Sequence, residues 1–189
     1  MSLVWAVQRE VKDLSTASAF EASSRGPVAR YLRRTVESLQ RSEYFPGAAS
    51  GTFVGGIQCQ DLQALSFRDA AFDLCTSTEV MEQVADDGAA FRELHRVLRP
   101  GGVLAFTVPI TGSHRTVERA RLSAGQITHI LPPAFHGDRL TGTDSVLVFR
   151  DYGLDIVERV QAAGFGKVKL VTPDRNWFGH LRKVVVAKK

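Results

Sequence analysis

Short apolar segments alternate with longer amphipathic ones through the middle of the chain. Residues 72–78 are apolar at the start and polar at the end, which is typical of a buried strand that runs out to a sheet edge. Residues 87–98 carry apolar positions at helical spacing, and 103–108 form a continuous apolar run, as expected for a strand covered on both faces. Between them, Pro100-Gly101-Gly102 predicts a helix stop, because proline cannot extend a helix and glycine allows the exit.

The same alternation continues on both sides of this core. Before the core we expect an amphipathic helix near the N-terminus, a helix from Pro27 to about Leu39, and strands over 17–22, 41–45 and 57–59. After it we expect a helix over 153–163 and strands over 167–171 and 183–187. Strands that alternate with helices predict an α/β fold: a doubly wound, Rossmann-like, mostly parallel sheet with helices on both faces. The last two strands are close in sequence, so the final strand is expected to be antiparallel.

One stretch, residues 111–145, departs from this pattern. It has weak periodicity and many Gly, Pro and Thr residues, and we interpret it as an insertion or lid that is partly helical near 117–122. The prolines and glycine of 131–138 indicate a fixed loop. With 189 residues, the whole chain (1–189) is expected to form one domain.

Composition narrows the class of protein. Hydrophobic residues make up 44% and charged residues 23%, which argues against disorder. No apolar run is long enough to span a bilayer, and the charged N-terminal segment does not resemble a secretory signal. Cys59 and Cys75 lie in apolar segments, and the chain has no Cys-x-x-Cys pair and no His/Cys cluster with zinc spacing. We therefore expect reduced thiols, no metal site and a cytoplasmic protein with no membrane partner.

The positive charge is mild and dispersed. The formal net charge is +4, and Arg30, Arg33 and Arg34 are the nearest approach to a basic patch. We interpret that group as a solvated helix face. Aromatic residues do not alternate with basic ones as single-strand binders require, which argues against a nucleic-acid partner.

Three linked segments resemble motifs of the class I S-adenosylmethionine-dependent methyltransferases. They are Cys59-Gln60-Asp61-Leu62 with the following 65–74, then 77–84 (Ser-Thr-Glu-Val-Met-Glu-Gln-Val), and 91–102, which ends in Leu-Arg-Pro-Gly-Gly. The resemblance covers 58–109 well and 18–44 and 152–171 more loosely. It implies the Rossmann-like fold, S-adenosylmethionine as cofactor, and methyl transfer as the activity.

The resemblance also implies roles for particular residues. Glu43, at the end of the second expected strand, matches the acid that binds the ribose hydroxyls, and a carboxylate can accept two such donors. Asp61 matches the acid that receives the adenine amino group, and Leu62 offers an apolar wall. Ser77 and Glu79 fall in the segment beneath the methionine part and the acceptor. Alternatives remain open, because Glu43 would also suit an arginine pair and Asp61 a strand-end turn.

The first motif differs from the family pattern. The usual glycine-rich turn is replaced by 21–27 (Glu-Ala-Ser-Ser-Arg-Gly-Pro), which has one glycine. Glu21 keeps the acidic place, Ser23 lies in the turn, and Gly26 permits close backbone approach. Arg25 is placed where it would compete with the cofactor for space. A second difference is Gln83, where many relatives carry a histidine, so a proton acceptor must come from elsewhere.

Candidate catalytic residues come from the less regular region. His136, paired with Asp138, would suit acid/base work, and Tyr152 follows an apolar run. Glu82 has two interpretations, a helix-end cap or a site residue. The first functional hypothesis is methyl transfer to a small-molecule or glycan-like acceptor. The alternative is an inactive methyltransferase-like binding or scaffold protein. A nicotinamide-dependent enzyme ranks low because no Gly-x-Gly-x-x-Gly turn is present. The sequence does not indicate an oligomeric state.

Overall fold

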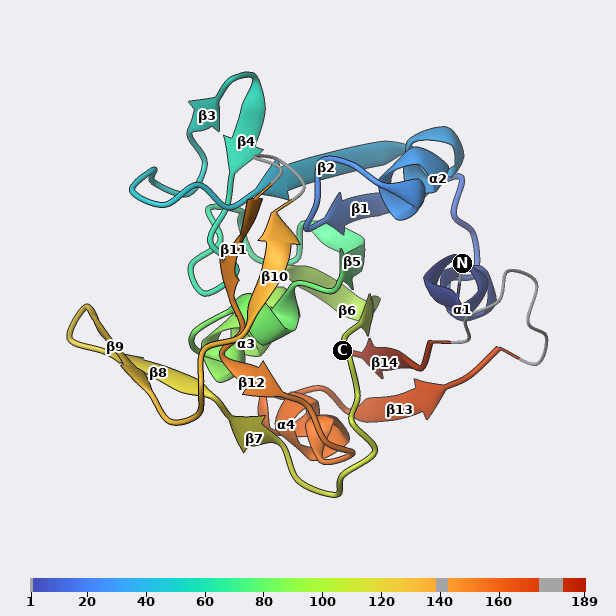
Figure 1. Cartoon of the computed structure of the whole chain (residues 1–189). Helices are drawn as coiled ribbons and strands as arrows, with labels where there is room; N and C mark the ends of the chain where they lie inside the picture. Colours follow the sequence, from blue (N-terminus) through green and yellow to red (C-terminus); the bar gives the residue numbers. More distant parts are fainter. Residues whose placement is uncertain (1, 139–142, 174–181) are drawn as a thin grey trace.

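A central eight-stranded sheet organises the molecule. The computed structural model describes residues 2–138, 143–173 and 182–189, and the strand order in the sheet is β13-β14-β6-β5-β1-β2-β4-β3 (Figure 1). The strands of this sheet are β1 (Ser18–Glu21), β2 (Ser38–Glu43), β3 (Phe53–Val54), β4 (Ile57–Cys59), β5 (Phe72–Thr78), β6 (Leu98–Thr107), β13 (Lys167–Val171) and β14 (Val184–Lys188). The helices are α1 (Ser2–Glu10), α2 (Pro27–Thr35), the short 3₁₀ helix η1 (Met81–Gln83), α3 (Asp87–Val97) and α4 (Ile156–Ala162).

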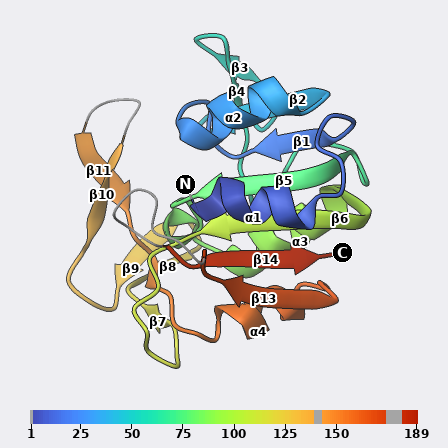
Figure 2. The same cartoon turned by 90° about the vertical axis from the view of Figure 1, so that its right-hand side faces the viewer.

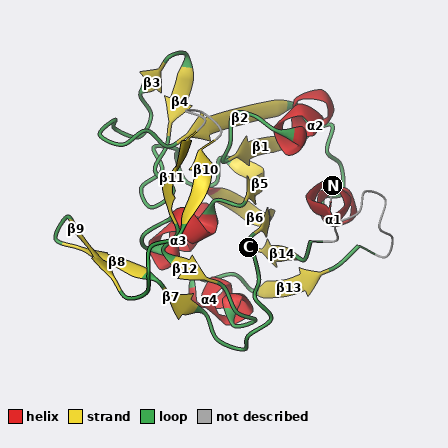
Figure 3. Ribbon diagram, in the orientation of Figure 1, coloured by secondary structure: helices red, strands yellow, loops and turns green. Residues whose placement is uncertain are grey.

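The sheet is parallel through its centre and antiparallel at both edges. β4, β2, β1, β5 and β6 run parallel to one another, whereas β14 is antiparallel to both β6 and β13, and β3 is antiparallel to β4. This is the predicted doubly wound, Rossmann-like fold class, with the final strand antiparallel as expected (Figure 3).

Helices cover both faces of the sheet (Figure 2). On one face, Leu3 and Val7 of α1 and Leu32 of α2 pack in one buried cluster with Ala105 of β6 and Val186 of β14. Neighbouring strand residues point to opposite faces, so the next positions along these strands belong to the second cluster.

The second cluster lies under α3 and α4. Phe91 and Leu94 of α3 and Ile156 of α4 pack with Leu104 and Phe106 of β6. These side chains are essentially inaccessible to solvent. The alternation along β6 confirms that this strand is buried on both faces, as its continuous apolar run predicts.

Three elements match their predicted bounds, and others are shifted. β4, β5 and β13 cover the residues expected of them, and β14 is displaced by one residue. The helix expected to reach Leu39 ends at Thr35, and β2 begins at Ser38 rather than Arg41. The difference arises because Ser38 already pairs with Ser18 of β1. Residues from Ser38 onward therefore form a strand, although their local pattern was also compatible with a helix.

The helix predicted over 87–98 ends before Pro100-Gly101-Gly102, as expected, but the strand predicted from Val103 begins five residues earlier. The helix ends at Val97, and β6 starts at Leu98 and runs through the segment, with an irregular register opposite β5. Gly101 has a φ of +79°. A Cβ on Gly102 would lie 2.8 Å from the carbonyl oxygen of Arg99. The two glycines therefore accommodate the bend of a strand rather than the exit of a helix.

The stretch 111–145 forms strands where a helix was expected. β7 (Val117–Glu118) pairs with β12 (Arg150–Asp151), β8 (Ala120–Ser123) with β9 (Gln126–His129), and β10 (Phe135–Asp138) with β11 (Thr143–Leu147). The helix prediction near 117–122 was wrong because Ala124 and Gly125 both have positive φ, the turn of a tight hairpin. Figure 1 shows the β8–β9 hairpin extending away from the body of the domain.

Candidate functional site

A cleft of about 510 Å³ lies at the carboxyl ends of the parallel strands. A doubly wound sheet places its ligand at this edge, and the volume falls within the usual range for small-molecule sites. One wall is polar and comes from the ends of β2 and β4. The other is apolar and is made by Val80, Val84, Leu122, Ile127, Val146, Leu147 and Phe149.

Glu43 on the polar wall organises the turn that follows β1. Its Oε1 atom accepts hydrogen bonds from the backbone nitrogen and the hydroxyl of Ser24, both at 2.7 Å. The Ser23 hydroxyl lies 3.4 Å from the same atom. Among the described residues, the hydrogen-bond partners of the Glu43 side chain are thus serines rather than an arginine. Glu43 therefore ties the altered first motif to the end of β2 and also faces the cleft.

Glu21 lies behind this turn rather than in the cleft. It is 1% exposed and accepts a hydrogen bond from the Thr76 hydroxyl. Burial raises the pKa of Glu21 to about 7, against the opposing effect of Thr76 and with a contribution from the charge of Glu43. It bridges β1 and β5 at the point where the turn begins.

The turn leaves space near the start of α2. Gly26 has a φ of +103°, and a Cβ built there would meet nothing within 4 Å. Arg25, whose side chain was expected to compete for this space, is exposed and is not among the residues that line the cleft. Ala22 does line it. Ser23 and Gly26, like Arg25, are not among the lining residues.

Asp61 and Leu62 follow β4 and both line the cleft. The Oδ1 atom of Asp61 accepts from the backbone nitrogen of Gln63 at 2.9 Å and from its side chain at 3.0 Å. This is the strand-end turn foreseen as an alternative, and it coexists with a position on the polar wall.

Ser77 and Glu79 lie at the end of β5, next to the cleft but not among its lining residues. Five side chains here have buried oxygen atoms without a hydrogen-bond partner among the described residues: Ser77, Thr78, Glu79, Thr107 and Glu82. The other oxygen of Glu79 pairs with Arg182, and Glu79 has a φ of +55°. A buried polar atom without a partner is costly, so a cluster of them indicates a place that a ligand completes.

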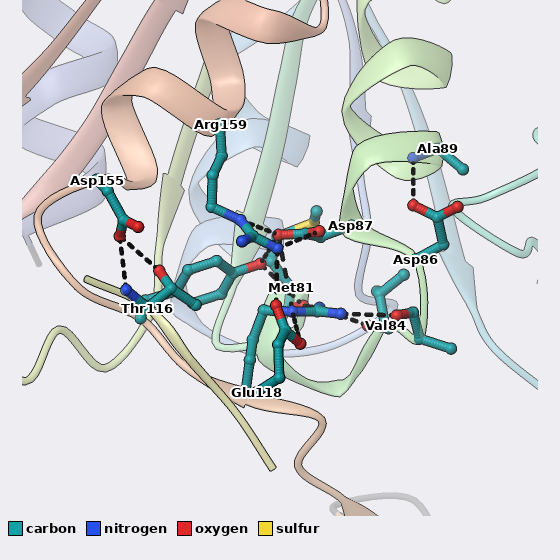
Figure 4. A network of polar contacts seen from close by, with 12 residues as sticks. Met81, Val84, Asp86, Asp87, Ala89, Thr116, Glu118, Asp155 and Arg159 are labelled. Atoms are coloured by element: carbon teal, nitrogen blue, oxygen red, sulfur yellow. Dashed lines mark hydrogen bonds and ion pairs between the residues drawn. The ribbon is translucent and has the colours of Figure 1, made fainter. Parts of the chain in front are cut away.

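Tyr152 lies apart from the cleft. It is 0% exposed, and its hydroxyl donates to Asp87 at 3.0 Å. Burial and the nearby Asp87 charge raise the pKa of Tyr152 well above its ordinary value. Asp87 also receives Arg159 at 2.8 Å, and Glu118 receives the same guanidinium at 3.0 Å (Figure 4). This network joins η1, α3 and α4, so the tyrosine serves the packing of the domain.

His136 lies at the margin of the cleft. Its Nδ1 atom is 3.3 Å from Oε1 of Glu82 and 3.4 Å from Nε2 of Gln83. Gln83 lines the cleft, and so does Val146, the cross-strand partner of His136. The side chain of Asp138, its expected partner, lies outside the described part of the structure. Sequence reasoning did not pair His136 with Glu82, because 53 residues separate them and no local pattern links them.

The fold and the cleft define a Rossmann-like α/β protein with a ligand site at the carboxyl edge of its sheet. Residues 22–106 match the family model described as a methyltransferase domain. A malonyl-[acyl-carrier protein] O-methyltransferase of Pseudescherichia vulneris is 47% identical over 82 residues, covering 43% of this chain and 28% of that relative. The chain thus spans well under half the length of the curated relatives it matches.

Solved structures match over nearly the whole chain. An S-adenosylmethionine-dependent methyltransferase from Mesorhizobium loti has a TM-score of 0.62 at 16% identity, covering 97% of this chain and 96% of that one. A second, from Methanosarcina mazei, has a TM-score of 0.61 at 15% identity, covering 100% and 99%. These likenesses show that the chain has the fold of S-adenosylmethionine-dependent methyltransferases, and that residues 22–106 are similar to a methyltransferase domain.

No group of three His, Cys, Asp or Glu side chains in the described ranges is arranged to hold a metal ion. None of the helices in those ranges combines the length and apolar character needed to cross a membrane.

Proposed function

We propose that this domain binds S-adenosylmethionine and transfers its methyl group to a small-molecule acceptor. The observation that carries the proposal is the cleft at the carboxyl edge of the sheet, with Glu43, Asp61 and Leu62 on one wall. These are the residues that the family resemblance assigns to the ribose and the adenine. The bound cofactor supplies an activated methyl group on a sulfonium, and the protein needs chiefly to align the two reactants and exclude water.

Each residue has a role that its contacts allow. One oxygen of Glu43 holds the turn, which leaves Oε2 for the ribose hydroxyls. Asp61 takes the adenine amino group and Leu62 the ring face. Glu21 and Ser23 shape the turn, and Gly26 lets the backbone approach the methionine part. Ser77 and Glu79 offer buried oxygen atoms that lack hydrogen-bond partners among the described residues.

The apolar wall favours an acceptor with an apolar body over a glycan-like one. Leu122, Ile127, Val146 and Leu147 come from the β8–β9 and β10–β11 hairpins, in the region we interpret as an insertion or lid. A sugar presents hydroxyls on most of its surface and would leave them unpaired against these side chains. The relative that acts on a malonyl-[acyl-carrier protein] is consistent with an acyl-bearing acceptor.

Calorimetric titration with S-adenosylmethionine and S-adenosylhomocysteine tests this function. We expect saturable binding to the wild type and weaker binding to Glu43→Gln and Asp61→Asn. Glu37→Gln is the matched control, because Glu37 is exposed and lies just before the opposite end of β2. Folded wild-type protein that binds neither compound at millimolar concentration (about −4 kcal/mol) would refute the proposal. The alternative of an inactive binding or scaffold protein would then stand.

A further inference from the structure

Glu82 is a buried acid whose carboxylate accepts no hydrogen bond among the described residues. The residue is 1% exposed, and a close nitrogen is Nδ1 of His136, 3.3 Å from Oε1. Its backbone, by contrast, is fixed, because its carbonyl accepts from the nitrogen of Phe149 at 2.8 Å. Burial of an unsatisfied carboxylate is expensive. The burial of the Glu82 carboxylate without hydrogen bonds therefore indicates a functional role for this side chain.

Charged groups reach Glu82 from several elements. Glu79 and Arg182 approach from the end of β5 and the start of β14, Arg150 from β12, and His136 from β10. Arg150 is engaged with backbone carbonyls, including that of Val84 at 2.6 Å. Burial raises the pKa of Glu82 to about 8; the charge of Glu79 acts in the same direction, and Arg182 and Arg150 oppose it.

His136 is not itself among the residues that line the cleft, but it lies on the same face of its hairpin as one that is. Directly opposed residues of an antiparallel pair project to the same face, and the partner of His136 is Val146, which lines the cleft. The His136 side chain is 37% exposed, whereas the Glu82 side chain beside it is 2% exposed. No partner for its Nε2 atom is recorded among the described residues.

Two neighbours compete for the Nδ1 atom of His136, and they require opposite tautomers. When ionised, above its raised pKa of about 8, Glu82 is an acceptor at 3.3 Å, which favours a proton on Nδ1. Gln83 presents its Nε2 donor at 3.4 Å, which favours a lone pair there. The amide of Gln83 is oriented by the carbonyl of Glu79, to which the same nitrogen donates at 3.1 Å. The proton on the ring is therefore set by which neighbour prevails.

We infer that Glu82 is a positioning residue that holds His136 with its Nε2 lone pair toward the cleft, as the proton acceptor for an acceptor hydroxyl. This rests on the proposed methyl transfer. The hydroxyl oxygen forms the new bond to the methyl carbon, the electron pair of the broken carbon–sulfur bond stays on sulfur, and the hydroxyl proton passes to Nε2. At a pH where Glu82 is ionised, its carboxylate stabilises the imidazolium that results, which later releases its proton to water.

The pair also restricts the substrate class. A carboxylate acceptor is already ionised at neutral pH and has no proton to give. A hydroxyl holds its proton at that pH and needs a base as the new bond forms. The Glu82–His136 pair thus points to an acceptor with an apolar body whose reacting oxygen is protonated. This acceptor differs from the malonyl group named for the relative, whose free oxygen nucleophile is a carboxylate.

Nitrogen-15 NMR of histidine-labelled protein decides between the two neighbours. We expect the Nδ1–H tautomer for wild-type His136 at a pH above the value of about 8 at which Glu82 ionises, with the signal assigned by its loss in His136→Asn. Glu82→Leu should convert it to the Nε2–H tautomer, and the control Gln83→Leu should not. An Nε2–H tautomer in the wild type would overturn the inference without any variant having to fold.

Adding S-adenosylhomocysteine to the same sample separates this inference from the proposed function. Binding with an Nε2–H tautomer overturns the positioning role alone. An Nδ1–H tautomer without binding overturns the proposed methyl transfer, and the proton-acceptor role with it. Methyl transfer to malonyl-coenzyme A as a carboxylate probe, at a rate unchanged by His136→Asn, would also overturn that role.

Discussion

Two buried acids five positions apart have opposite environments. Asp87 at the start of α3 is 5% exposed and Glu82 in η1 is 1% exposed. Burial tends to raise the pKa of Asp87, but Arg159, Arg150 and Tyr152 outweigh it and hold that pKa below its ordinary value. Glu82 lacks such donors, and burial raises its pKa to about 8. Burial alone therefore does not mark a functional acid; the presence or absence of partners does.

The two sites also differ in what surrounds them. The Asp87 network lies among η1, α3, α4 and the β7–β12 pair, and every member has a partner within it (Figure 4). The Glu82 site is beside the cleft, with several oxygen atoms left without partners among the described residues. A completed network stabilises the fold, whereas an incomplete one is available to a ligand.

The largest expected effect is loss of the completed network. Asp87→Asn should lower the free energy of unfolding by about 3 kcal/mol, because a buried guanidinium loses its carboxylate. This loss lies at the lower end of the range for breaking a buried ion pair, because Glu118 still contacts both arginines. Chemical denaturation at neutral pH measures the loss in unfolding free energy. Asp69→Asn is the control: this acid is 79% exposed and pairs with Arg96 at the surface, so its loss should cost at most about 1 kcal/mol. Equal losses would erase the contrast between paired burial and surface pairing.

Glu82 should instead make the protein less stable as the pH rises. Its folded-state pKa of about 8 lies above the unfolded value of 4.5, so the folded state binds more protons between those values. Stability contributed by this group is therefore lost through that window, by up to about 1.4 kcal/mol per pH unit. Glu21 acts in the same direction up to about pH 7.

The difference between wild type and Glu82→Gln isolates this effect. Unfolding free energies of both proteins, measured from pH 5 to 9, should diverge in favour of the variant as the pH rises, since the amide cannot ionise. Parallel curves would mean that Glu82 has partners that the described contacts do not include.

The sequence predicts the helices and strands of the central sheet better than it predicts the site. The apolar run of β5 and the apolar stripe of α3 were sufficient to predict these elements, because hydrophobic periodicity is a local property. The β8–β9 hairpin was missed because its turn depends on Ala124 adopting a positive φ, which residue identity does not favour. Glu43 and Asp61 were assigned to the cofactor site from their resemblance to family motifs, and both line the cleft. The Glu82–His136 contact depends on how a hairpin folds over the sheet, and no spacing in the chain encodes it.

The smallest expected effect concerns Tyr152, which joins the completed network. Tyr152→Phe removes the donor to Asp87 while keeping the ring in the core, so we expect a loss of about 1 kcal/mol in the free energy of unfolding. Binding of S-adenosylhomocysteine should be unchanged, because Tyr152 is not among the cleft residues. Tyr31→Phe, on α2 and only partly buried, controls for the loss of a tyrosine hydroxyl. Weaker binding in a stable Tyr152→Phe protein would instead connect the completed network to the cleft and make Tyr152 part of the site.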